Sequence, residues 1–360
     1  EKSSSNIKNA YFTIQAGYEK TKSKTEDDDH KEKIFDYGYI GKFQQHIRPT
    51  YEYVDSLEGR YQSGFEYYNL TYTPGTENPT GTPYTNQFYA LTDPSSINYY
   101  SDVQQGLGLM NGDRPASIYG LWYNTGRQYN GYSYNDNSQF RVFANFSADI
   151  KKHAVQLGFE YEQRTERAYS LSPIGLWTRM REITNAHIQG LDKTNPILNS
   201  NPDDNSFWLI YPHYDYARLN DNLDPATGQP WSDPTKRTQY QFDRSLREKL
   251  GYDPNGTQWI DIDSYAPSTY SIDMFSADDL LNVGGAQYVA YYGYDHTGKK
   301  LNSNPSLDDF FTKTDADGNF TREIGAYRPI YNAGSIQDKF DFKDLKFNVG
   351  LRIDRFDVTQ

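Results

Sequence analysis

The residues best suited to bind a metal ion form one short acidic segment near the C-terminal end of the chain. The segment contains Asp315, Asp317, Asn319 and Glu323, with Gly318 between them. Alternating oxygen ligands on a tight loop can wrap around calcium, although this glycine comes two places too early for an EF-hand. Asp-Gly is also a common reversal of a β-hairpin. The segment is therefore either a calcium loop or a plain turn, and the pattern favours the turn.

A second group of candidate binding residues consists of four tryptophans. Trp177, Trp208, Trp231 and Trp259 all lie in one long interval between predicted strands. Exposed aromatic faces can stack on a sugar or grip an apolar ligand. The alternative is that these side chains form the small core of a folded loop, because large apolar side chains are usually buried.

The sequence lacks the common catalytic motifs. It contains no Gly-x-Ser-x-Gly elbow, no His-Glu-x-x-His and no complete Gly-x-x-x-x-Gly-Lys-Ser/Thr phosphate loop. Acidic pairs such as Asp261 and Asp263 could in principle serve glycoside hydrolysis, which needs two acids about 5–10 Å apart. Close sequence neighbours rarely meet that geometry. We therefore expect neither enzymatic activity nor a cofactor, apart from the calcium alternative.

The composition favours a β-rich envelope protein over a soluble enzyme. Only 36% of the 360 residues are hydrophobic, yet 16% are aromatic and 34 are tyrosines. Many tyrosines with few aliphatic residues suit barrel walls, aromatic belts and long polar loops. The chain has no cysteine, which excludes disulfides, and its net charge of -12 disfavours a nucleic-acid partner.

The elements that would position these residues are long β-strands. In residues 139–166, apolar side chains alternate with polar ones along two arms separated by the polar turn Lys151–His153. Side chains of a strand point alternately to opposite faces, so the pattern predicts a hairpin with one apolar and one polar face. Each arm has about 10–12 residues, whereas soluble strands most often have about 5–6 and a membrane strand needs about 9–11.

The same alternation gives the expected organisation of the whole chain as an all-β protein. Strands are predicted at about 10–22, 34–44, 139–150, 154–168, 331–342 and 345–357, with long loops at about 49–137 and 169–330. Short turns at one end of a sheet and long loops at the other are typical of outer-membrane barrels. We therefore expect part of a transmembrane antiparallel β-barrel with long, partly structured extracellular loops.

Three segments also carry a family resemblance. Residues 140–150, residues 157–164 and residues 346–356 resemble barrel strands of TonB-dependent outer-membrane receptors, in particular the large receptors of the Bacteroidetes type. The resemblance covers about a third of the chain clearly. It implies a location in the bacterial outer membrane, in contact with its lipid.

The resemblance implies that the chain supplies barrel wall and external loops for uptake of an iron chelate, an oligosaccharide or a peptide. Energy would come from the TonB system acting through a plug domain, for which this sequence has no counterpart. Some relatives also work with a surface lipoprotein. Six predicted strands are fewer than the roughly 8 of the smallest closed barrels, so we expect a segment of a longer receptor. Two alternatives stay open, a structural or adhesive scaffold barrel and a soluble carbohydrate-binding β-sandwich.

Overall fold

The computed structural model describes residues 6–54, 59–117, 127–188, 197–200, 207–210, 226, 239–282 and 284–358. Strands account for 41% and helices for 21%, so the expected all-β class is wrong and the fold is mixed. The expected antiparallel pairing is confirmed, and the sheets formed by the described residues are open. Every helix in these ranges is too short or too polar to cross a membrane.

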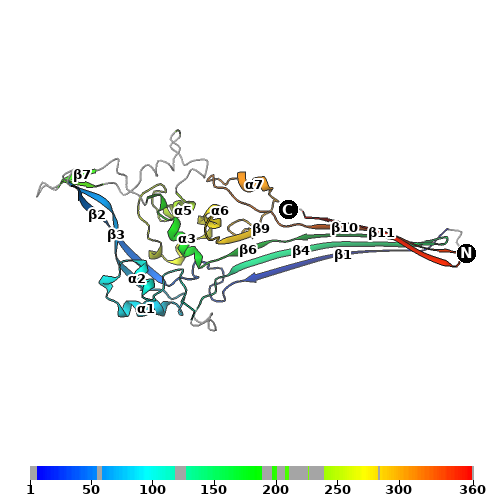
Figure 1. The fold of residues 1–360 in the computed structure, drawn as a ribbon, viewed down its shortest axis with the longest axis horizontal. Coiled ribbons are helices and arrows are strands. Elements are labelled where there is room, and N and C mark those ends of the chain that lie inside the picture. Colours follow the sequence, from blue (N-terminus) through cyan, green and yellow to red (C-terminus); the bar gives the residue numbers. More distant parts are fainter. Residues whose placement is uncertain are drawn as a thin grey trace.

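A sheet of five long strands forms an arm that extends from a compact head (Figure 1). The strands are β1 (Ile7–Thr25), β4 (Tyr132–Ile150), β5 (His153–Thr165), β10 (Ile330–Phe342) and β11 (Leu345–Asp357). Each pairs antiparallel with the next in the order β1-β4-β5-β10-β11. The long strands thus follow one another across the sheet in chain order, as in an up-and-down meander. At the head end, the short strands β6 (Ala168–Leu171) and β9 (Val289–Tyr292) extend this sheet.

The connections at the two ends of the arm differ greatly in length. At the tip, β4 joins β5 through Lys151 and Lys152, and β10 joins β11 through Lys343 and Asp344. The first residue of each turn has φ 58°, the left-handed conformation that two-residue hairpin turns commonly use. At the other end, the chain leaves the arm after β1 and after β5, and the described residues between 26 and 131 and between 166 and 329 form the head (Figure 1).

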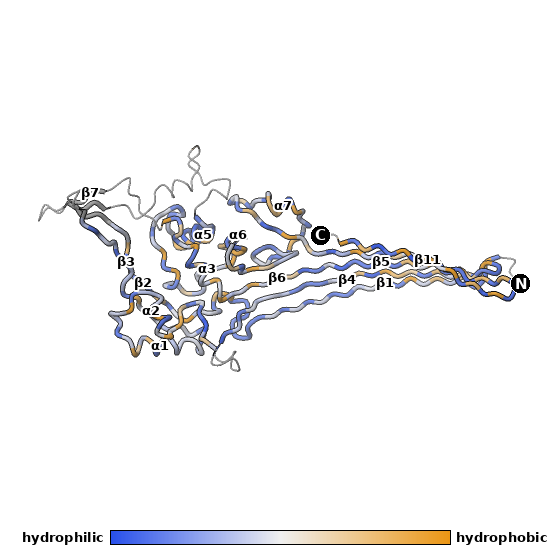
Figure 2. Tube along the Cα trace, viewed as in Figure 1, coloured by the Kyte–Doolittle hydropathy of each residue, from blue (hydrophilic) through white to orange (hydrophobic). Residues whose placement is uncertain are grey.

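Strand register divides the arm into one apolar and one polar face. One row of directly paired residues across the five strands contains Phe12, Phe146, Leu157, Ile336 and Leu351. Directly paired residues share a face, so the predicted period-two pattern of single strands becomes a largely apolar surface across the sheet, interrupted near the tip by Asp338, which pairs with Val155 and Val349. Figure 2 shows the resulting alternation of hydrophobic and hydrophilic residues along each strand.

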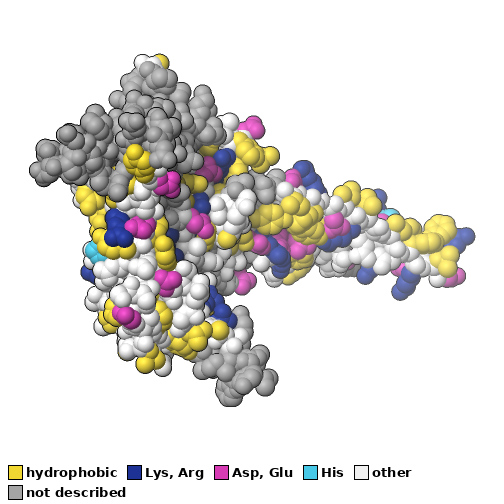
Figure 3. All heavy atoms as spheres, turned by 60° about the vertical axis from the view of Figure 1, so that its left-hand side comes forward, with side chains coloured by type: hydrophobic (Ala, Val, Ile, Leu, Met, Phe, Trp, Pro, Cys, Tyr) yellow, Lys and Arg dark blue, Asp and Glu magenta, His cyan; other side chains and the backbone are white. Residues whose placement is uncertain are grey.

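The apolar face is open in the described part of the chain. Leu157 is 43% exposed and Leu351 is 61% exposed, and hydrophobic side chains are visible at the surface of the arm in Figure 3. The opposite face carries the adjacent row Tyr11, Ser147, Gln156, Gln337 and Gly350. All five of these residues, together with members of the apolar row such as Leu157 and Leu351, line a hollow of about 500 Å³.

The head consists of a second sheet and several short helices. Its sheet has the order β2-β3-β8-β7, with β2 (Gly41–Val54), β3 (Gly59–Pro74), β7 (Ile197–Ser200) and β8 (Phe207–Ile210). The helices are α1 (Thr82–Leu91), α2 (Tyr100–Gln105), α3 (Gly175–Ile183), α5 (Gln241–Lys249), α6 (Ala277–Leu281) and α7 (Leu307–Thr312). Single helical turns occur at η2 (Pro94–Ser96), η3 (Ala186–Ile188), η5 (Ile262–Ser264), η6 (Pro267–Thr269) and η7 (Ile272–Met274).

Two hydrophobic cores hold the head together. The larger core combines Phe35 and Tyr39 from the first excursion with Trp177, Phe242 and Phe275 from the second. The smaller core lies beneath β2, β3, α1 and α2 and includes Phe43, Leu70, Phe88 and Val103. The loops expected at about 49–137 and 169–330 therefore contain a folded head, because their many aromatic residues are buried against one another.

One predicted arm strand is wrong. The alternation at 34–44 indicated a return strand beside the first strand, but residues 35–38 form turns and β2 begins only at Gly41. Strand β2 then pairs with β3. Phe35, Tyr37 and Tyr39 are buried in the head. Their period-two spacing resembles that of a strand, because aromatic residues that pack into a core from consecutive turns can also alternate with polar residues.

Candidate functional site

A cavity of about 150 Å³ lies in the head where the β2–β3 hairpin, α2, α3 and the segment before η5 converge. Its lining combines three aromatic residues with a small set of polar ones. The aromatic residues are Tyr67, Tyr100 and Trp259, and the polar residues used below are Arg181, Thr184 and Asp261. Apolar walls with a few convergent polar groups are typical of binding sites.

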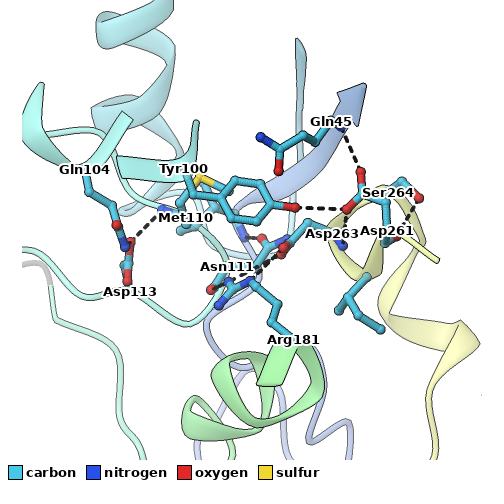
Figure 4. Close-up of polar contacts among 12 residues, drawn as sticks. Gln45, Tyr100, Gln104, Met110, Asn111, Asp113, Arg181, Asp261, Asp263 and Ser264 are labelled. Atoms are coloured by element: carbon cyan, nitrogen blue, oxygen red, sulfur yellow. Dashed lines mark hydrogen bonds and ion pairs between the residues drawn. The ribbon is translucent and has the colours of Figure 1, made fainter. Parts of the chain in front are cut away.

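A buried carboxylate, Asp263, forms the base of this site (Figure 4). The Nε atom of Arg181 donates to its Oδ2 at 2.7 Å, and Asn111 donates to its Oδ1 at 2.9 Å. Arg181 also donates to the backbone carbonyl of Asn111. Because both carboxylate oxygens accept hydrogen bonds and the guanidinium lies against them, the charges of Arg181 and Asp263 compensate each other.

The Asn111 side chain joins this base to the start of the hairpin. Its Oδ1 accepts hydrogen bonds from the backbone N–H groups of Ile40 and Gly41, at 2.7 and 3.2 Å. Its Nδ2 donates to the Gly41 carbonyl at 2.9 Å as well as to Asp263. The loop before residue 112, the hairpin and η5 are therefore fixed relative to one another, which gives the cavity a defined shape.

The second carboxylate, Asp261, faces the cavity. Its Oδ2 accepts from the backbone N–H of Gln45 at 2.8 Å, and its Oδ1 accepts from the Tyr100 hydroxyl at 3.0 Å (Figure 4). No Lys, Arg or His in the described ranges forms an ion pair with it. Burial and the neighbouring charge of Asp263 raise the pKa of Asp261 to about 6. Both causes disfavour the ionised carboxylate.

The aromatic walls and one hydroxyl complete the site. The Trp259 and Tyr67 rings lie 6.2 Å apart between centroids, inclined by 57°. The Arg181 guanidinium lies 5.8 Å from the centre of the Tyr100 ring. Thr184 is 3% exposed and lines the cavity, and its Oγ1 has no hydrogen-bond partner within the described structure. A buried hydroxyl without a partner is unusual in a folded protein.

The structure separates those of the predicted tryptophans that it describes. Only Trp259 is seen at the cavity. Trp177 is fully buried in the larger core, where its indole N–H donates to the carbonyls of Phe35 and Tyr37, at 3.2 and 3.1 Å. Trp208 lies in β8, where its backbone pairs with Asn199, and Trp231 lies outside the described residues. For Trp177, the interpretation as a core residue fits the structure.

The acidic segment near the end of the chain folds as a tight turn. The backbone N–H of Asn319 donates to Asp315 Oδ1 at 2.8 Å, and Gly318 has φ 77°. Glu323 accepts a hydrogen bond from Lys313 at 2.7 Å. No three acidic or histidine side chains in the described ranges converge as metal ligands would. The segment therefore brings Asp315 and Asn319 together as a turn, whereas the charge of Glu323 is paired with a lysine.

The raised pKa of Asp261 leads to an expected pH dependence. Below about pH 4 the folded and unfolded states both hold the proton, since the ordinary value is 3.8. Between about 4 and about 6 only the unfolded state loses it, so this residue lowers stability as pH rises through that window. The loss is at most about 1.4 kcal/mol per pH unit. The titratable groups that interact with Asp261 are Asp263, Tyr100, Tyr67, Tyr265 and Tyr270, and Arg181 lines the same cavity.

We expect Asp261→Asn to remove that contribution. Head stability, followed by hydrogen exchange at α3 and η5 from pH 4 to 7, should fall less steeply with rising pH in the variant than in the parent. The difference between the stability curves of parent and variant gives the contribution of Asp261 alone, because the other acids are present in both proteins. Parallel curves for parent and variant would contradict the assignment.

Comparison with family models, curated proteins and solved structures finds no match for this chain. The geometry of the arm and the head is therefore the basis on which the class of this protein is inferred.

Proposed function

We propose that this chain forms a wall segment of an outer-membrane β-barrel receptor, with the head as its external, ligand-capturing part. The observation that carries the proposal is the aligned apolar row Phe12, Phe146, Leu157, Ile336 and Leu351, which crosses all five long strands on an uncovered face. A soluble sandwich would need a second layer over this face. Acyl chains are the environment that suits it without one.

The dimensions of the apolar face support the same environment. On β11, apolar residues alternate from Leu345 to Ile353. At about 3.4 Å per residue and a tilt of about 40°, this stretch has a height of about 21 Å, against about 25 Å for the apolar band of bacterial barrels.

The orientation follows from the lengths of the connections. Bacterial barrels have short turns on the periplasmic side and long loops outside. The turns at Lys151–Lys152 and Lys343–Asp344 would therefore face the periplasm, and the head would face the medium. Strands β1 and β11 each have one long-strand partner in the described structure, and further barrel strands would pair with their free edges.

Nutrient uptake is the function that best accounts for a head with its own cavity, and it agrees with the resemblance to TonB-dependent receptors. In this proposal the TonB system would act through a plug domain, and a surface lipoprotein could cover the head. The nutrient would be captured by the head and pass along the polar side of the wall. A scaffold barrel would use the same wall and would not need the cavity.

The test uses the absence of cysteine from the chain. Single variants Ser95→Cys in the head and Lys152→Cys at the tip are each treated with a membrane-impermeant maleimide on intact bacterial cells. We expect labelling of Ser95→Cys only, with Lys152→Cys labelled after the outer membrane is opened. Labelling at both positions on intact cells, or a protein that stays monodisperse in buffer without detergent, would contradict the proposal.

A further inference from the structure

We infer that the cavity between Tyr67, Tyr100 and Trp259 binds an organic cation, the ammonium or guanidinium group of a lysine or arginine side chain in a peptide. This inference names the ligand class for the proposed receptor. It rests on the proposed uptake function only for the direction in which the peptide would move. The binding itself depends on charge, walls and size alone.

The charge of the site is the first step. Arg181 directs its guanidinium to Asp263, at 2.7 Å from Nε to Oδ2, so these two charges are matched. Asp261 has only neutral donors in the described structure, the backbone N–H groups of Gln45 and Asp263 and the Tyr100 hydroxyl. Arg181, Asp263 and Asp261 together carry one net negative charge, and Asp261 and Arg181 both line the cavity. A partly buried carboxylate is costly when unpaired, and a ligand cation would offset that cost.

The walls are the second step. Trp259 and Tyr67 present two inclined rings with centroids 6.2 Å apart, and Tyr100 is held in place by its hydrogen bond to Asp261. A cation within about 6 Å of an aromatic face is attracted to it, most strongly to Trp. Aromatic rings next to a carboxylate recognise a cation better than a neutral ligand, because both kinds of group favour positive charge.

The size of the cavity is the third step. The cavity of about 150 Å³ is smaller than the roughly 300–1,000 Å³ of pockets for drug-sized molecules. It therefore suits the end of one side chain, with the rest of the peptide outside.

The experiment measures binding to the purified intact protein in detergent, by calorimetry at pH 7.5. The probes are acetyl-Gly-Lys-Gly-amide and acetyl-Gly-norleucine-Gly-amide, which differ in the terminal ammonium group, with maltotriose as a neutral sugar. We expect binding of the lysine peptide only. Asp261→Asn should weaken that binding at least ten-fold, and Trp259→Leu, which keeps the carboxylate, should weaken it several-fold.

The matched control is Asp308→Asn on α7, an exposed acid far from the cavity lining, which should bind like the parent. Equal binding of the norleucine peptide, binding of maltotriose instead, or no binding of the lysine peptide to a correctly folded parent would each overturn the inference. None of these results depends on the cysteine labelling of cells. Failure of the cation site and failure of the receptor proposal are therefore distinguishable.

Discussion

Replacing Leu157 with arginine is expected to destabilise the membrane-embedded protein by about 2–4 kcal/mol, the cost of arginine at the centre of a barrel's lipid face. Leu157 lies near the middle of the apolar part of β5 and within the row that crosses all five long strands. In the proposed orientation, its replacement by arginine would place a charge among acyl chains. The free energy of unfolding in lipid vesicles, measured by urea titration, checks this value.

The control is the adjacent residue on the opposite face. Gln156 lies in the polar row, paired with Ser147 and Gln337, so Gln156→Arg should change the free energy of unfolding by well under 1 kcal/mol. Both substitutions introduce the same side chain one position apart in the same strand. Equal losses for the two variants, or a larger loss for Gln156→Arg, would show that the apolar face does not contact lipid.

The second large effect is expected in the head, from Arg247→Leu in α5. Arg247 and Asp243 are both fully buried and lie 2.8 Å apart, from Nε to Oδ2. Arg247 also donates to the Gln258 carbonyl at 2.8 Å and to Asn185 Oδ1 at 3.2 Å. Removing one member of a buried pair leaves an uncompensated charge and typically costs about 3–5 kcal/mol.

The measurement for Arg247→Leu is hydrogen exchange in α3 and α5, supported by limited proteolysis of the head. Arg244 on the same helix is the matched control, because it is partly exposed and lies 3.7 Å from Glu248, so Arg244→Leu should have little effect. Adding Asp243→Leu to Arg247→Leu should recover part of the lost protection, since it removes the stranded carboxylate. Unchanged protection in Arg247→Leu would contradict the role of this pair.

The arm could be predicted from the sequence because its pattern is local. The strands predicted at 331–342 and 345–357 correspond to Ile330–Phe342 and Leu345–Asp357. Period-two alternation over a dozen residues determines both the strand and its faces.

The head could not be predicted in the same way because its contacts join distant parts of the chain. Asp261 and Asp263 were visible as a pair of acids, but nothing near them in sequence indicated that Arg181 would neutralise one and leave the other without a cation. Tyr67, Tyr100 and Thr184 carried no local signal either. They reach the cavity from three separate elements, and only the packing of those elements brings them together.

The larger head core has a consequence for biogenesis. Phe35 and Tyr39 precede β4 in the chain, whereas Phe242 and Phe275 are synthesised only after β5. In the proposed orientation, both excursions must be exported before this core can form. The first excursion therefore lacks the core residues Phe242 and Phe275 until the second has been exported. Maturation of the head would then be a late event, and a periplasmic chaperone that shields aromatic segments would find its client in residues 26–131.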